Sequence, residues 1–123
     1  MLTKEQAIEN HRKMWNWIAD ETLKQKRVVR KQEYFVANNI PDSIRPDSDC
    51  YCCEYSIINF RRSCSVCPIQ WNHRLCYVSE YNDWRAAYYK ENYKKAAKLA
   101  RKIAKLPENK HIASVGKRRR LKR

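Results

Sequence analysis

The chain has 123 residues, including one glycine and four prolines, and a formal net charge of +14. This length fits one domain with a modest core, and the scarcity of glycine and proline disfavours a β-rich fold with many tight turns. The sequence has no long apolar run, which excludes a membrane-spanning helix, and 14 of the 27 Lys and Arg residues lie from Lys90 onward with only two acidic residues.

A first helix is predicted to begin at about residue 4, because Thr3 and Gln6 have the spacing of a capping box. At about 100° per residue, one apolar stripe runs along this helix with charged and polar residues opposite. The stripe comprises Ala7, Ile8, His11, Met14, Trp15, Ile18 and Thr22. On this apolar side, a hydrogen-bonded core histidine is favoured over a metal ligand, and Trp17, which lies off the stripe, is expected to pack against another element.

Helical character is predicted to continue to about residue 35, through the basic run KQKRVVRK at residues 24–31. A solvated helix face is favoured over a phosphate contact for this run. A polar, proline-broken loop over residues 38–47 then leads the chain to Cys50.

All six cysteines lie in the 27 residues from Cys50 to Cys76. Two Cys-x-x-Cys pairs, Cys50/Cys53 and Cys64/Cys67, are separated by ten residues, and such pairs present thiolates to one tetrahedral ion. Because the N-terminus lacks the apolar core of a secretory signal, we expect reduced thiols in the cytoplasm and therefore a structural zinc site.

Several alternatives to this zinc site remain open. The gap between the pairs is shorter than the usual fifteen to twenty residues or so, and Cys76 can therefore replace one member of the second pair. An iron–sulfur cluster, disulfides or merely buried thiols are further alternatives. Cys52 directly adjoins Cys53 and is expected to be a spectator, while His73 is a disfavoured fourth ligand.

A second long helix is predicted from about residue 82 to 105, with Pro107 marking its end. One arc of its helical wheel is cationic: Lys90, Lys94, Lys95, Lys98, Arg101, Lys102 and Lys105. The opposite arc is apolar and rich in alanine, which would allow close approach of the first helix: Tyr89, Tyr93, Ala96, Ala97, Leu99, Ala100, Ile103 and Ala104. After residue 116 comes a basic tail of six cations in seven residues, which we expect to order on a polyanion: Lys117, Arg118, Arg119, Arg120, Lys122 and Arg123.

The central motif resembles a pattern of small, cysteine-rich proteins encoded by bacteriophages, largely of unassigned function. The residues that carry the resemblance span about 50–84 and include Cys50-Tyr-Cys-Cys53, Cys64-Ser-Val-Cys67-Pro68, Trp71, Cys76, Tyr81 and Trp84. The resemblance implies a metal set drawn from Cys50, Cys53, Cys64, Cys67 and Cys76, with Cys52 as an addition. It does not include the arginine-rich tail, and it implies an accessory protein of the host-cell cytoplasm that contacts nucleic acid or a host machine.

These features together predict a mainly α fold, in which two long helices (about 4–35 and 82–105) pack on a central zinc-binding module (50–76). The domain would span residues 1–116, with 117–123 as its tail. The favoured function is non-enzymatic binding of the RNA or DNA backbone by counterion release, through a row of cations and the tail. The row comprises Lys90, Lys94, Lys98, Arg101 and Lys105.

Two other function classes compete with nucleic-acid binding. A protein-directed inhibitor or adaptor would use the same cations against an acidic surface of a host enzyme or defence complex. An enzyme is disfavoured, because the sequence has no paired-carboxylate motif, phosphate loop or His-Glu-x-x-His motif, and Asn72 with His73 is only a weak echo of a nuclease site. A cysteine nucleophile partnered by His73 would compete with metal for the same thiols.

Overall fold

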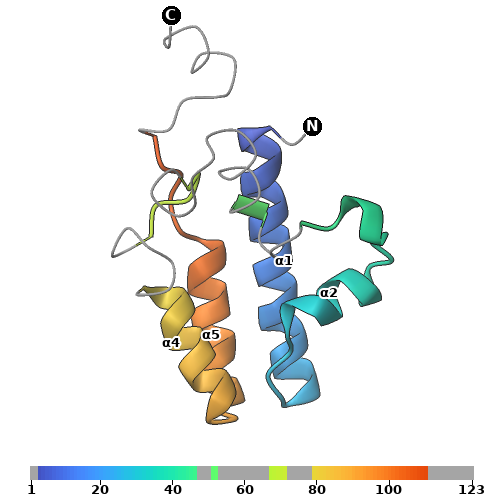
Figure 1. The fold of residues 1–123 in the computed structure, drawn as a ribbon. Helices are drawn as coiled ribbons and strands as arrows, with labels where there is room; N and C mark the ends of the chain where they lie inside the picture. The colour runs from blue at the N-terminus through green and yellow to red at the C-terminus, as the bar shows by residue number, and fades with distance from the viewer. Residues whose placement is uncertain (1–2, 47–50, 53–66, 72–78, 111–123) are drawn as a thin grey trace, which may run out of the picture.

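The computed structural model describes residues 3–46, 51–52, 67–71 and 79–110, and within them the protein is mainly helical (Figure 1). The described elements are α1 (Lys4–Gln25), α2 (Lys31–Ala37), the short 3-10 helix η1 (Asp42–Ile44), α4 (Glu80–Tyr89) and α5 (Tyr93–Ala104). No helix in these residues is long and apolar enough to cross a lipid bilayer.

α1 begins as predicted. The Thr3 hydroxyl accepts a hydrogen bond from the Gln6 amide at 3.0 Å, and the Gln6 side chain accepts one from the Thr3 amide at 2.9 Å. This reciprocal pairing satisfies two amides that a helix start leaves free. Every residue of the predicted apolar stripe is buried, so the helical period assigned this face correctly.

The first helix ends ten residues earlier than predicted. Lys26 has φ 56° and ψ 37°, a left-handed conformation that stops α1 after Gln25. The chain then buries Val28 and Val29, and the Val29 amide donates to the Thr22 hydroxyl at 3.2 Å. Burial of these two β-branched residues outside the helix favours the turn over continued helix, and α2 begins separately at Lys31.

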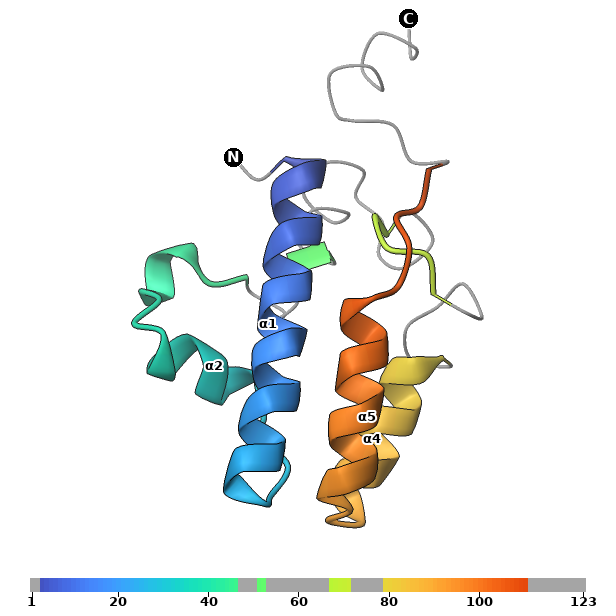
Figure 2. The ribbon, with the colours of Figure 1, turned by 180° about the vertical axis from the view of Figure 1, so that it is seen from behind.

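The predicted helix over residues 82–105 is a hairpin of two helices. α4 ends at Tyr89, Glu91 takes φ 54°, and the Asn92 side chain accepts from the Lys95 amide at 3.2 Å to start α5. The Asn92 amide also donates to the carbonyl of Ala87 at 2.9 Å, which closes the turn. α5 therefore runs back antiparallel to α4 and to α1, as Figures 1 and 2 show.

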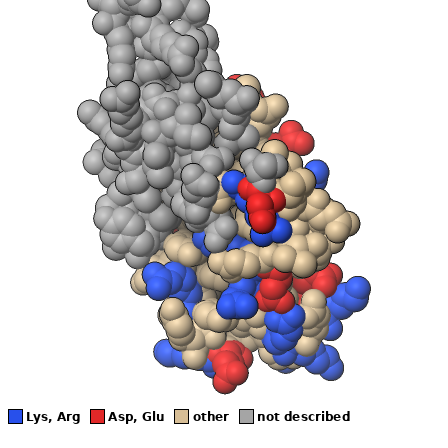
Figure 3. All heavy atoms as spheres, turned by 45° about the vertical axis from the view of Figure 1, so that its right-hand side comes forward, with Lys and Arg blue, Asp and Glu red and all other residues tan. Residues whose placement is uncertain are grey.

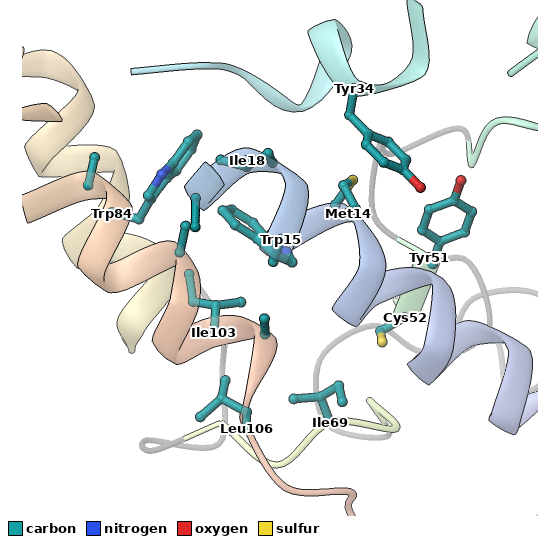
Figure 4. Close-up of a cluster of buried hydrophobic side chains, with 14 of the residues drawn as sticks. Met14, Trp15, Ile18, Tyr34, Tyr51, Cys52, Ile69, Trp84, Ile103 and Leu106 are labelled. Carbon is teal, nitrogen blue, oxygen red and sulfur yellow. The ribbon is translucent and has the colours of Figure 1, made fainter. Parts of the chain in front are cut away.

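Trp15 of α1 is at the centre of the three-helix contact between α1, α4 and α5. Its ring meets that of Trp84 edge-on at 5.0 Å between centroids, and Ile103 of α5 lies on the same side of α1 (Figure 4). Ala96 and Ala100 are fully buried, and α5 makes its most extensive helix contact with α1. The prediction that the alanine-rich arc packs on the first helix is confirmed.

The other side of α1 is covered by α2 and residues 51–52. The ring of Trp17 contacts that of Tyr34 at 5.5 Å, which confirms that Trp17 packs against an element outside the main stripe. Phe35 contacts Tyr51 at 6.1 Å, and Figure 4 shows Tyr34 and Tyr51 on the side of α1 away from Trp84. α1 is therefore the central helix of the described structure.

The segments 67–71 and 106–109 lie side by side at the end of the helices where α1 begins. Ile69 and Glu108 form an antiparallel bridge, the Gln70 amide donates to the Pro107 carbonyl at 2.9 Å, and Lys4 pairs with Glu108 at 2.8 Å. Lys4, though buried, also donates to the Asn109 carbonyl at 3.1 Å. These contacts fix the chain that follows α5 against the start of α1.

Candidate nucleic-acid interface

The structure describes two of the six cysteines. Cys67, a predicted metal ligand, is buried, and its carbonyl accepts from the Asn109 side chain at 3.2 Å. Cys52 lies in the core and its thiol donates to the carbonyl of Ala7 at 3.8 Å. The predicted ligands Cys50, Cys53, Cys64 and Cys76, and His73, lie outside the described residues. Within those residues no group of three metal-ligating side chains is present.

The described edges of the cysteine module both meet the first turns of α1. Cys52 contacts Ala7, and the ring of Trp71, four residues after Cys67, meets His11 edge-on at 6.0 Å. Ala7 and His11 are one helical turn apart on the same face. The two Cys-x-x-Cys pairs therefore adjoin segments that dock on the same part of the core.

His11 is the hydrogen-bonded core histidine that the sequence predicts. It is 1% exposed, and its Nε2 lies 3.3 Å from the carbonyl oxygen of Ile103. Since a carbonyl only accepts, the proton is on Nε2. Burial lowers the pKa of His11 to about 4, so the ring is neutral at pH 7. Nδ1 has no hydrogen-bond partner among the described residues.

Five exposed lysines form a continuous surface along α5, which we call the lysine face: Lys94, Lys95, Lys98, Lys102 and Lys105. They occupy an arc of about 100° and extend about 17 Å along the helix axis. α5 contains no acidic residue. Among the described residues, the ammonium groups of Lys94, Lys95, Lys98 and Lys105 form no ion pair.

The lysine face differs from the predicted row of cations at two positions. Lys90 is the C-cap of α4 and lies in the turn before α5, so it is not on α5. Arg101 is on α5 but points to α1, where its guanidinium donates to the Asn16 side chain at 2.8 Å and pairs with Asp20. The turn at residues 90–92 removes Lys90 from the row, whereas Arg101 leaves it through its contacts with α1.

Two acidic residues border the lysine face, one on each neighbouring helix. Asp20 of α1 is paired with Arg101, and Glu80 of α4 lies 3.9 Å from the ammonium of Lys102. The carboxylates that these two helices place beside the lysine face are therefore offset by cations, and the exposed Glu91 lies in the turn three residues before Lys94. By contrast, Figure 3 shows a face on which basic and acidic side chains are intermixed.

The basic run over residues 24–31 and the basic tail differ from the lysine face. In the run over residues 24–31, Arg27 forms two hydrogen bonds with Glu33, one of 3.1 Å, and Lys31 lies over the Tyr81 ring at 4.7 Å. The cations of the tail, Lys117, Arg118, Arg119, Arg120, Lys122 and Arg123, lie outside the described residues. The described chain ends at the exposed Lys110, five residues after the last lysine of the lysine face.

Sequence reasoning missed one exposed aromatic side chain. Tyr89 is 70% exposed at the end of α4, and the Arg85 guanidinium lies over its ring at 6.0 Å. A hydrogen bond to Tyr89 raises the pKa of the Arg85 guanidinium. The wheel of a continuous helix assigns Tyr89 to the packing arc, but α4 buries Glu80, Trp84 and Ala87, and Tyr89 lies away from that face.

Comparison with known proteins gives no match: no protein-family model, curated protein or solved structure is significantly similar to the chain.

Proposed function

We propose that this protein binds the phosphate backbone of DNA or RNA through the lysine face of α5 together with the basic tail. It acts as a non-enzymatic accessory protein of the bacteriophage type that its cysteine pattern resembles. The observation that carries the proposal is the set of five exposed lysines on one acid-free helix, bordered by carboxylates that already have cationic neighbours. Each phosphate neutralised by such a lysine releases condensed counterions, which drives binding.

The basic tail would contribute to the same binding. In the sequence it begins twelve residues after Lys105, the last lysine of the lysine face. Six further cations on a short segment would add phosphate contacts and, through arginine, bidentate ones. Helix and tail together then account for most of the net charge.

The cysteine module would hold structural zinc within the set Cys50, Cys53, Cys64, Cys67 and Cys76. The chemistry of the donors supports this assignment, because thiolates at this spacing suit tetrahedral zinc. Cys52 fits a spectator role, since its thiol is buried and donates to a backbone carbonyl. When bound, the ion would contribute folding free energy and no catalytic chemistry.

The test compares two double variants of equal charge. Lys94→Gln/Lys98→Gln removes two cations from the lysine face, and Lys13→Gln/Lys24→Gln removes two exposed cations from α1. Fluorescence anisotropy with a short DNA duplex and an RNA hairpin should show affinity lowered on the order of tenfold for the first variant and nearly unchanged for the second.

Equal losses for the two double variants would mean that only net charge matters, and would remove the lysine face from the site. A protein-directed role is the competing outcome. In that case neither nucleic acid binds the wild-type protein, and a stoichiometric protein partner is retained on it after nuclease treatment.

A further inference from the structure

Arg101 is the only arginine of α5, and the structure separates it from the lysines around it. Its Nη1 donates to Oδ1 of Asn16 at 2.8 Å, and its Nη2 donates to Oδ1 of Asp20. Asn16 and Asp20 are one turn apart on α1, so the two acceptors hold both terminal nitrogens of one planar group. The guanidinium is thereby oriented along α1 and not with the lysine face.

Asp20 is the reason this orientation matters for binding. Its side chain is 65% exposed at the border between α1 and the lysine face. An unpaired carboxylate there would repel a phosphate that approaches α5. Arg101 offsets that charge, as Lys102 does for Glu80 at the opposite border, where the two groups are 3.9 Å apart.

We propose that Arg101 supports the lysine face by neutralising Asp20, without itself contacting nucleic acid. The inference rests on the proposed nucleic-acid binding and specifies its ligand. Arginine can donate two parallel hydrogen bonds to a guanine base or to a phosphate group. Lysine is a compact point charge that lacks this geometry. With its arginine engaged, the lysine face binds the phosphate backbone and reads no base.

The test measures affinity for short DNA duplexes over a range of salt concentrations, using the full chain. The proteins are wild type, Lys98→Gln, Arg101→Gln, Asp20→Asn/Arg101→Gln and Arg101→Lys. We expect Lys98→Gln to reduce the slope of log affinity against log salt by about 0.9, the value for one lost phosphate contact. Arg101→Gln should weaken binding about two- to fivefold at low salt and reduce the slope by less than Lys98→Gln does, because the repulsion from an uncompensated Asp20 is itself screened by salt.

Asp20→Asn/Arg101→Gln restores the local charge balance and should return the affinity to within about twofold of wild type. Arg101→Lys keeps a cation opposite Asp20 and should do the same, even if the double variant were to fold poorly. Duplexes of different base composition should bind the wild-type protein equally.

The inference is overturned if Arg101→Gln reduces the slope as much as Lys98→Gln while the double variant stays weak, because Arg101 would then contact phosphate. A base preference that Arg101→Gln abolishes would overturn it as well. These results leave the proposed function standing, whereas a wild-type protein with no measurable binding would end both proposals.

Discussion

The imidazole of His11 joins three parts of the molecule, since it projects from α1, donates to the Ile103 carbonyl of α5 and contacts the Trp71 ring. Ile103 is in the last turn of α5, and its carbonyl also accepts from the Leu106 amide at 3.3 Å. The neutral ring donates to the same oxygen, which has two lone pairs. Its burial, the main cause of the lowered pKa, makes the charged form costly, with the cations of Arg12 and Lys31 as smaller contributions.

This environment predicts a loss of stability in mild acid. The pKa of His11 is about 4 in the folded protein and about 6.5 in the unfolded chain, so below pH 6.5 the unfolded state binds a proton that the folded state does not. The free energy of unfolding should fall by about 2 kcal/mol between pH 7 and pH 5. Urea unfolding at a series of pH values measures this change.

The variant His11→Gln is the control for that prediction, because glutamine can donate to the Ile103 carbonyl but does not titrate. Its free energy of unfolding should be nearly constant between pH 7 and pH 5. The lowered pKa values of Glu33 and Glu108 act at lower pH, below their ordinary value of 4.5. An equally steep pH dependence in His11→Gln would contradict the assignment to His11.

Among the helices, periodicity predicted which faces are buried better than where the elements end. The apolar stripe of α1 is buried, and so are the four alanines and Ile103 of the predicted arc of α5, because burial follows the helical period whatever the length of the helix. The two interruptions were missed because neither contains glycine or proline. Lys26 and Glu91 adopt positive φ, a conformation that such residues enter only when tertiary contacts compensate.

The turn before α5 did carry a local signal in Asn92. Asparagine is a preferred N-cap residue, and here its side chain accepts from the Lys95 amide. Had it been read as a cap, the sequence would have predicted a helical hairpin and excluded Lys90 from the row of cations. The orientation of Arg101 could not have been predicted, because it depends on where α1 places Asn16 and Asp20 in space.

Asn92→Ala should therefore destabilise the protein by about 1 kcal/mol, since it leaves an amide of the first turn of α5 without its acceptor. Asn92→Asp retains an oxygen acceptor and should be close to wild type. Chemical denaturation of both variants at pH 7 makes the comparison. Equal losses in the two variants would show that the side-chain cap does not hold the turn.

For the molecule as a whole, the described edges of the cysteine module and the lysine face occupy different surfaces of the helical core. The segments that adjoin the cysteine module dock on the start of α1, and the lysine face runs along α5. Composition predicted the basic C-terminal third and the mainly helical class. Which four thiols bind zinc depends on the distances between the cysteine sulfur atoms, and the spacing in the sequence does not fix these. The ligand set therefore stays a prediction.

Zinc binding is tested by native mass spectrometry on matched cysteine variants. Cys67→Ser should release the metal and lower the thermal unfolding temperature to that of chelator-treated protein, because structural zinc contributes folding free energy. Cys52→Ala should retain one bound ion. Wild-type protein purified without metal, or unfolding that a chelator leaves unchanged, would contradict the zinc assignment.

The most direct measurement for the lysine face is a lysine footprint, in which an amine-reactive reagent labels the protein with and without a DNA duplex. Mass spectrometry of the digests would give the extent of labelling at each lysine. The account predicts that bound DNA protects Lys94, Lys95, Lys98 and Lys105, while labelling of Lys13 and Lys24 on α1 is unchanged. Uniform labelling on α5 with protection of the α1 lysines would contradict it.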